Sequence, residues 1–142
     1  MTEQRPAPSL PVLEFLWWVF LASALLIPVV VGVALPPASG APPPWAEALF
    51  LAGLAASLPA WLLKRHFDNH LQRPAFRTLA QPERLGKVQQ VMFLGLAAAE
   101  LPMYAGLAHY LFSGQVIGAT ILTLITLALM LLFHPSRILR AR

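Results

Sequence analysis

The chain has 142 residues, of which 58% are hydrophobic and only 11% are charged, whereas soluble domains carry roughly 25% charged residues. This balance indicates a membrane protein. The absence of cysteine excludes disulfides, thiolate metal sites and cysteine nucleophiles. The formal charge of +4 does not require a nucleic-acid partner, because basic residues gathered on one side of membrane spans give the same excess.

The first half of the chain predicts a transmembrane hairpin. The apolar stretch 12–35 is long enough to cross a hydrocarbon core, which needs about 20 helical residues. The segment PPASGAPPP at 36–44 cannot continue a helix, because five of its residues are prolines. A second apolar stretch follows at 45–63, and we expect Pro59 to kink its last turn.

The second half predicts another hairpin. Apolar residues run over 88–112, Ser113 and Gly114 form a turn, and a further apolar stretch covers 115–133. We therefore expect an all-α fold, an integral membrane four-helix bundle of two transmembrane hairpins that forms a single membrane domain over residues 1–142.

The polar segments predict the orientation in the membrane. Residues 1–11 read as an exposed tail, and residues 64–87 read as a polar loop with six of the ten basic residues. The two short turns at 36–44 and 113–115 contain no Lys or Arg. By the positive-inside rule, the polar loop and both termini are expected in the cytoplasm of a multi-pass protein of the cell membrane.

One acid stands out within the third apolar stretch. Glu100 is the only charged residue between Phe93 and Tyr110. A charged side chain at the centre of a bilayer costs about 3 kcal/mol on insertion scales, so an intramembrane acid is a candidate functional residue.

The helical periodicity separates this acid from the small residues of the same helix. At 100° per residue, bulky residues and Tyr104 lie on the side of Glu100, whereas the opposite side gathers a seam suited to close helix packing, formed by Gly95, Ala98, Ala99, Pro102 and Gly106. Glu100 is therefore expected to face lipid, another helix or another protomer.

The antiparallel fourth stretch offers polar partners at a matching depth. Thr123 and Thr126 are the candidates, and a protonated Glu100 could donate a hydrogen bond to either hydroxyl. We therefore assign Glu100, Tyr104, Thr123 and Thr126 to a candidate ion-binding site. The alternative is that Glu100 only fixes the register of two helices through such a bond.

The remaining polar residues give no sign of catalysis. His66 and His70 have the i, i+4 spacing that can bind one metal ion, but they lie in a basic segment and are interpreted as solvated histidines. No nucleophile elbow, phosphate loop or zinc helix motif occurs in the sequence. We predict neither an enzyme nor a cofactor or metal.

Residues 80–107, AQPERLGKVQQVMFLGLAAAELPMYAGL, resemble the proton-carrying c (or K) subunit of rotary ATP synthases, a proteolipid family. In that family a loop with Gln or Asn and Pro precedes, at fixed spacing, bulky apolar residues and the acid. Gln81 and Pro82, then Phe93 and Leu94, then Glu100 stand at the matching offsets, whereas Ala80 stands where the family has arginine. The resemblance implies that Glu100 carries a proton or a cation.

Two functions remain open from the sequence. The protein either handles protons or cations through Glu100, or it is a non-catalytic accessory or scaffold protein in which Glu100 forms a packing bond. Its expected partners are the lipid bilayer and either a second copy, forming a homo-oligomer, or another membrane subunit. No nucleic acid is expected.

Overall fold

The structure, a computed structural model, describes residues 9–140, and of these the side chains at positions 77 and 138–140 fall outside the description. The tail expected at the N-terminus therefore lies mostly outside the described residues. Within 9–140 all regular structure is helical, which confirms the all-α class. The helices are α1 (Leu10–Ala34), α2 (Ala46–Ala55), α3 (Ser57–Leu71), α4 (Pro74–Arg77), α5 (Gln81–Ser113), α6 (Val116–Leu132) and α7 (Pro135–Arg140).

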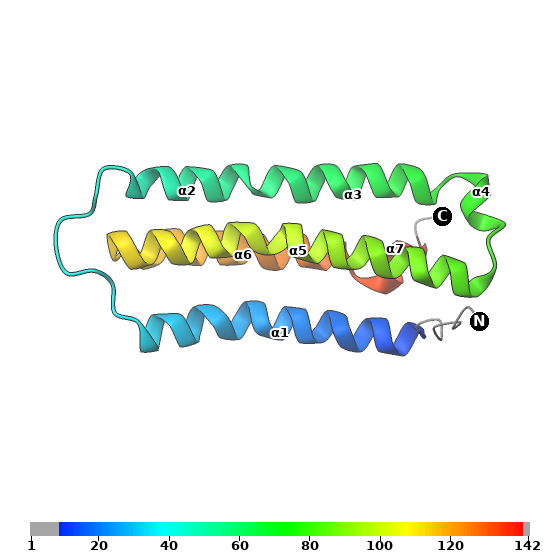
Figure 1. The fold of residues 1–142 in the computed structure, drawn as a ribbon, viewed down its shortest axis with the longest axis horizontal. Coiled ribbons are helices and arrows are strands. Elements are labelled where there is room, and N and C mark those ends of the chain that lie inside the picture. Colours follow the sequence, from blue (N-terminus) through cyan, green and yellow to red (C-terminus); the bar gives the residue numbers. More distant parts are fainter. Residues whose placement is uncertain (1–8, 141–142) are drawn as a thin grey trace, which may run out of the picture.

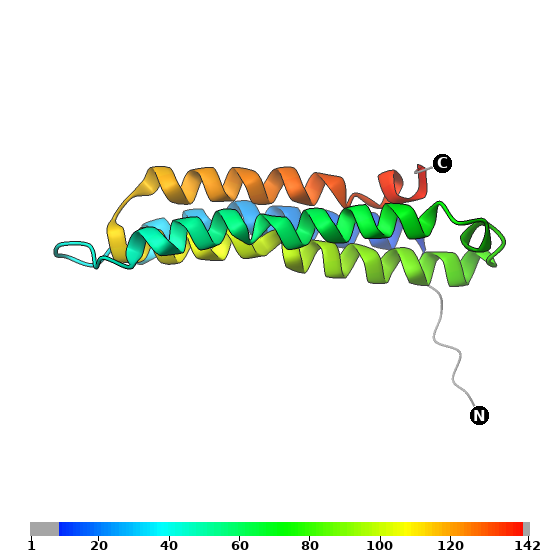
Figure 2. The same cartoon turned by 90° about the horizontal axis from the view of Figure 1, so that it is seen from above.

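The long helices lie side by side around α5. Figure 1 shows α5 between α1 on one side and the α2–α3 pair on the other, and Figure 2 shows α6 and α5 on opposite sides of this arrangement. The most extensive helix contact is between α5 and α6, and α5 also contacts α1, α2 and α3. The helix that carries Glu100 is therefore the one on which the others pack.

The second apolar stretch forms two helices in line. The break falls at Ala56, between α2 and α3, rather than in the last turn as expected. Pro59 lacks an amide hydrogen, so the carbonyl of Ala55 loses its helical partner at this point. The Ala56 amide still bonds the Ala52 carbonyl at 2.8 Å, which keeps the two helices nearly continuous.

The expectation of a polar loop over 64–87 is wrong in extent. α3 continues to Leu71, α4 occupies part of the connection, and α5 begins at Gln81. Lys64 and Asp68 form an i, i+4 ion pair, which is one local reason why the polar segment stays helical. Pro82 supports the early start of α5, because proline is well suited to the first turn of a helix.

The small residues of α5 pack against α6 and the residues that follow it. A Cβ added at Gly95 would lie 2.1 Å from Cδ1 of Phe133, and one at Gly106 would lie 3.2 Å from Cα of Ala119. Ala99 and Pro102 are also buried. Only residues without a bulky side chain allow this approach of two helices.

α1 is fixed mainly near its N-terminal end. The indole Nε1 of Trp17 donates to the Met130 carbonyl at 3.0 Å, and the Trp17 and His134 rings meet edge to face at 4.5 Å between centroids. The Phe20 ring contacts Phe93 of α5. Much of the rest of α1 is exposed, including Val33 at 84%. An apolar helix with so much exposed surface needs a nonaqueous environment.

Among residues 9–140, three segments are long and apolar enough to cross a membrane, namely α1, the continuous pair α2–α3 and α5. α6 is apolar as well, but it is shorter, with 17 residues. The length and composition of these helices indicate a membrane protein.

The contact at Gly95 generates a prediction about stability. We expect Gly95→Ala to lower the free energy of unfolding by about 1–3 kcal/mol, because the new methyl group would overlap the Phe133 ring in a buried contact. Unfolding of the purified protein in mixed detergent micelles, followed by circular dichroism, measures the change.

Gly86→Ala is the matched control on the same helix. No described atom outside its own stretch of backbone lies within 4 Å of a Cβ at this position, so the substitution should leave stability unchanged or raise it by up to about 1 kcal/mol. Equal effects of the two substitutions would contradict the close contact at Gly95.

Candidate functional site

Glu100 lies in the middle of α5 and is half-buried. Its partner is Tyr104, one turn further along the same helix, whose hydroxyl donates to Oε2 of Glu100 at 3.1 Å. The spacing of four residues places the two side chains above one another on one face, as a helix requires. The structure therefore brings together two of the four residues of the predicted site.

The face around this pair is open. Ala97, Leu101 and Tyr104 are exposed, the last two at 47% each. Leu96 and Met103, which flank Glu100 on its other side, are fully buried. Glu100 thus sits at the edge between the packed interior and an uncovered apolar face of α5.

Thr126 has a different partner from the one expected. Its hydroxyl accepts a hydrogen bond from the backbone amide of Met103 at 3.1 Å, and the side chain is fully buried. The bond lies next to Pro102, where α5 lacks one backbone donor. Thr126 therefore joins α6 to the α5 backbone. This contact lies in the packed interior, whereas the Glu100–Tyr104 pair lies at the open face of α5.

Thr123 lines a pocket between α1, α5 and α6, together with Thr120. Thr120 donates to the carbonyl of Val116 within its own helix, at 2.9 Å. Among the described residues, no hydrogen bond joins Thr123 to Glu100. The four predicted residues thus fall into a pair on the open face of α5, one interhelical contact and one pocket residue.

The two histidines of the polar segment lie in the last two turns of α3. The His66 and His70 rings are parallel with centroids 6.4 Å apart, and both residues are exposed. They line a pocket of about 250 Å³ together with Lys87 of α5. In the part of the chain that the structure describes, no three residues of the types His, Cys, Asp or Glu come together in a way that could hold a metal ion.

His109 is a polar residue whose role sequence reasoning missed. It is 1% exposed, and its Nδ1 lies 2.9 Å from the carbonyl oxygen of Ala46 at the start of α2. A carbonyl only accepts, so the proton of this bond sits on Nδ1. Gly118 of α6 leaves the room for the ring, because a Cβ there would lie 2.8 Å from its Cδ2. His109 of α5 thereby contacts both α2 and α6. The one sequence signal for this role is Gly118, a small residue on α6 that leaves room for the ring.

Comparison of the chain with models of known families, with curated proteins and with solved structures gives no match. The resemblance of residues 80–107 to the c subunit family accordingly stays a prediction.

The bond between Thr126 and the Met103 amide can be tested by removing the hydroxyl. We expect Thr126→Val to lower the free energy of unfolding by about 1 kcal/mol, because a buried amide loses its acceptor while the side-chain volume hardly changes. Unfolding in mixed micelles measures the loss.

Thr120→Val serves as the matched control. The Thr120 side chain is exposed and its hydroxyl bonds only its own helix, so the expected change is within about 0.5 kcal/mol. If Thr126→Val were as neutral as this control, the interhelical bond would have no measurable role.

Proposed function

We propose that the protein is a multi-pass membrane protein that binds and exchanges a proton or a small cation at the Glu100–Tyr104 pair. The observation that carries the proposal is that Glu100 bonds a residue of its own helix, on a face that the other helices leave uncovered. An acid in this position contributes little to joining helices, and an intramembrane carboxyl without a structural role is a functional candidate.

The chemistry of the pair fits this function. The Tyr104 hydroxyl donates to Oε2, so it stabilises the carboxylate after a proton leaves. Within the described residues Oε1 has no hydrogen-bond partner and is available to a proton or cation. The same helix carries the resemblance to c subunits, whose acid exchanges an ion in the membrane, and that resemblance supports the proposal.

The alternative is an accessory or scaffold protein in which Glu100 is a packing bond. Such a role calls for a bond from Glu100 to a second helix. The bond between α5 and α6 at this depth is instead made by the Met103 amide and Thr126, with no part taken by the acid. This geometry favours the ion-handling function.

The uncovered face has the spacing of a helix-packing surface. Leu94, Ala97, Leu101 and Tyr104 are exposed and recur at alternating three- and four-residue intervals, the pattern by which two helices pack along a seam. We include in the proposal a second copy or another membrane subunit that covers this face and delivers the ion to Glu100.

The proposed topology places four segments across the cell membrane, namely α1, α2–α3, α5 and α6, with both termini in the cytoplasm. α6 has 17 residues, about 25 Å of helix, which is at the short end of the range that spans a bilayer. All ten Lys and Arg lie outside the turns at 36–44 and 113–115, which supports this orientation.

Reporter fusions test the topology. An enzyme reporter that is active only outside the cytoplasm should be active when inserted at Gly40 and inactive when inserted at Ala75, because these positions lie at opposite ends of α2–α3. A reporter active only in the cytoplasm is the control and should give the reverse pattern. Activity of one reporter at both positions would contradict the proposed arrangement.

Carboxyl-directed carbodiimide labelling in lipid vesicles tests the function of Glu100. The reagent modifies a protonated carboxyl, so an exchanging acid should be labelled more strongly as the pH is lowered, and Glu100→Gln should abolish the signal because an amide offers no carboxyl to the reagent. Mass spectrometry locates the label on α5.

Two variants sharpen this measurement. Glu47→Gln removes an exposed acid at the start of α2 and should leave the labelling of Glu100 intact. Tyr104→Phe removes the hydrogen bond and should shift the pH at which labelling rises, without abolishing it. Labelling of Glu100 that is absent at every pH at which the protein stays folded would rule out proton exchange.

A further inference from the structure

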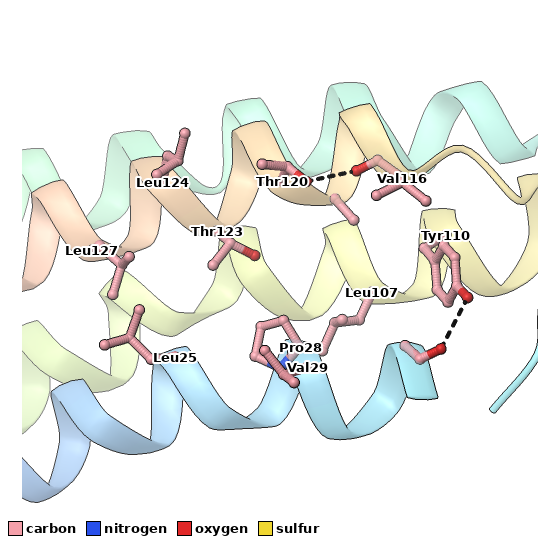
Figure 3. A pocket seen from close by; sticks show the side chains of 12 residues that line it. Leu25, Pro28, Val29, Leu107, Tyr110, Val116, Thr120, Thr123, Leu124 and Leu127 are labelled. Carbon is pink, nitrogen blue, oxygen red and sulfur yellow. Dashed lines mark hydrogen bonds between the residues drawn. The ribbon is translucent and has the colours of Figure 1, made fainter. Parts of the chain in front are cut away.

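A second feature of the molecule lies away from Glu100, where α1 and α6 separate. A pocket of about 450 Å³ opens between these two helices, with α5 as its floor. Figure 3 shows Leu25 of α1 and Leu127 of α6 at one end of the pocket, and Tyr110 of α5 at the other end. Its volume falls in the range of small-molecule sites, roughly 300–1,000 Å³.

The pocket extends along α6 from the end of the helices to Leu127, toward the place where α1 and α6 are joined. Beyond Leu25 and Leu127, the bond from Trp17 to the Met130 carbonyl holds α1 and α6 together. The lining on α6 extends back to Val116, its first residue. This stretch of α6 is about 16 Å long at about 1.5 Å per residue, close to half of the hydrocarbon core of about 30 Å. The pocket is therefore as deep as one leaflet.

Polarity changes along this length. The deep end is lined by leucines, whereas the end near the helix termini holds the Tyr110 hydroxyl, which lies 3.5 Å from the Gly32 carbonyl. Thr120 and Thr123 lie along the wall between the two ends. A molecule that fits this pattern has a long apolar chain and a polar head at the membrane surface.

The mouth of the pocket opens on surface that faces lipid. Val29, Val116 and Leu124, which border it, are between 59% and 62% exposed. A water-soluble ligand would have to leave water for an apolar surface, because nine of the twelve lining residues have no polar side chain. A lipid chain in the leaflet meets the opening directly.

We propose that this pocket binds one acyl chain of a membrane phospholipid, from the leaflet on the side of the 36–44 turn, with the headgroup next to Tyr110. The bound chain fills the gap that α1 leaves when it parts from α6. The site is separate from the Glu100–Tyr104 pair, so the two proposals stand or fall independently.

The test uses the full chain in phosphatidylcholine vesicles that contain a phosphatidylcholine with a photoreactive diazirine on its acyl chain. The protein is extracted, exchanged extensively into detergent to remove loosely associated lipid, and then illuminated. Lipid should remain bound, and mass spectrometry should find crosslinks at pocket residues such as Leu25, Val29 and Thr123, with excess unlabelled phosphatidylcholine in the vesicles reducing them.

Two glycine variants give a matched comparison. Gly32 lines the pocket, and no described atom outside its own stretch of backbone lies within 4 Å of a Cβ there, so Gly32→Leu adds an apolar side chain at the pocket from an open position. We expect retained lipid to fall by at least about tenfold, because the added side chain occupies the site. Gly86→Leu makes the same change at another open helical position outside the pocket and should retain lipid like the unmodified chain.

Three results would overturn the proposal. The first is no lipid retained by the unmodified protein after detergent exchange, and the second is retention that Gly32→Leu leaves unchanged. The third is crosslinking spread equally over Val33 and other outward residues of α1, which would indicate lipid around the protein only. A parallel experiment uses vesicles that contain a photoreactive isoprenoid. If the protein retains the isoprenoid and no phospholipid, the occupant is an isoprenoid and the phospholipid proposal is wrong.

Discussion

The close approach of α5 and α6 is the constraint on which the rest of the structure depends. Phe133 occupies the space that a side chain at position 95 would take, and Ala119 and Leu122 lie in tight contact with the position of a Cβ at Gly106. In lipid there is little hydrophobic force between helices, so close contact of this kind and buried hydrogen bonds are what hold them together. α5 is rotated about its axis so that the side with small residues, including Gly95 and Gly106, makes this contact.

That rotation decides where the acid goes. Because the small side of α5 faces α6, Glu100 turns toward the edge of the packed interior and its bond is made with Tyr104. At this depth α6 offers the hydroxyl of Thr126, which accepts a hydrogen bond from the backbone amide of Met103, beside Pro102. The acid thus has a hydrogen-bond partner within its own helix and is not held between two helices, which is the arrangement that the proposed ion exchange needs.

The same packing leaves α1 unevenly supported. Trp17 ties it to the end of α6, and Phe20 packs on α5, but towards Gly32 the helix parts from α6. A void of this size inside a soluble protein would be costly, since its lining loses dispersion contacts. In a bilayer the surrounding lipid has acyl chains that can restore those contacts. The proposed acyl chain would therefore complete the packing between α1 and α6.

The sequence by itself determined the class of protein, the helical nature of each apolar stretch and the opposition of the small seam and Glu100, because these depend on composition and on the period of the helix. Helix ends were predicted less well. The polar segment after residue 63 continues as helix, because polarity ends a membrane span but does not end a helix. Only the tertiary structure decided the partner of each side chain. Thr126 bonds Met103, and His109 reaches Ala46, across 63 positions of sequence, because those distances depend on how α5 is rotated and on where a glycine leaves room.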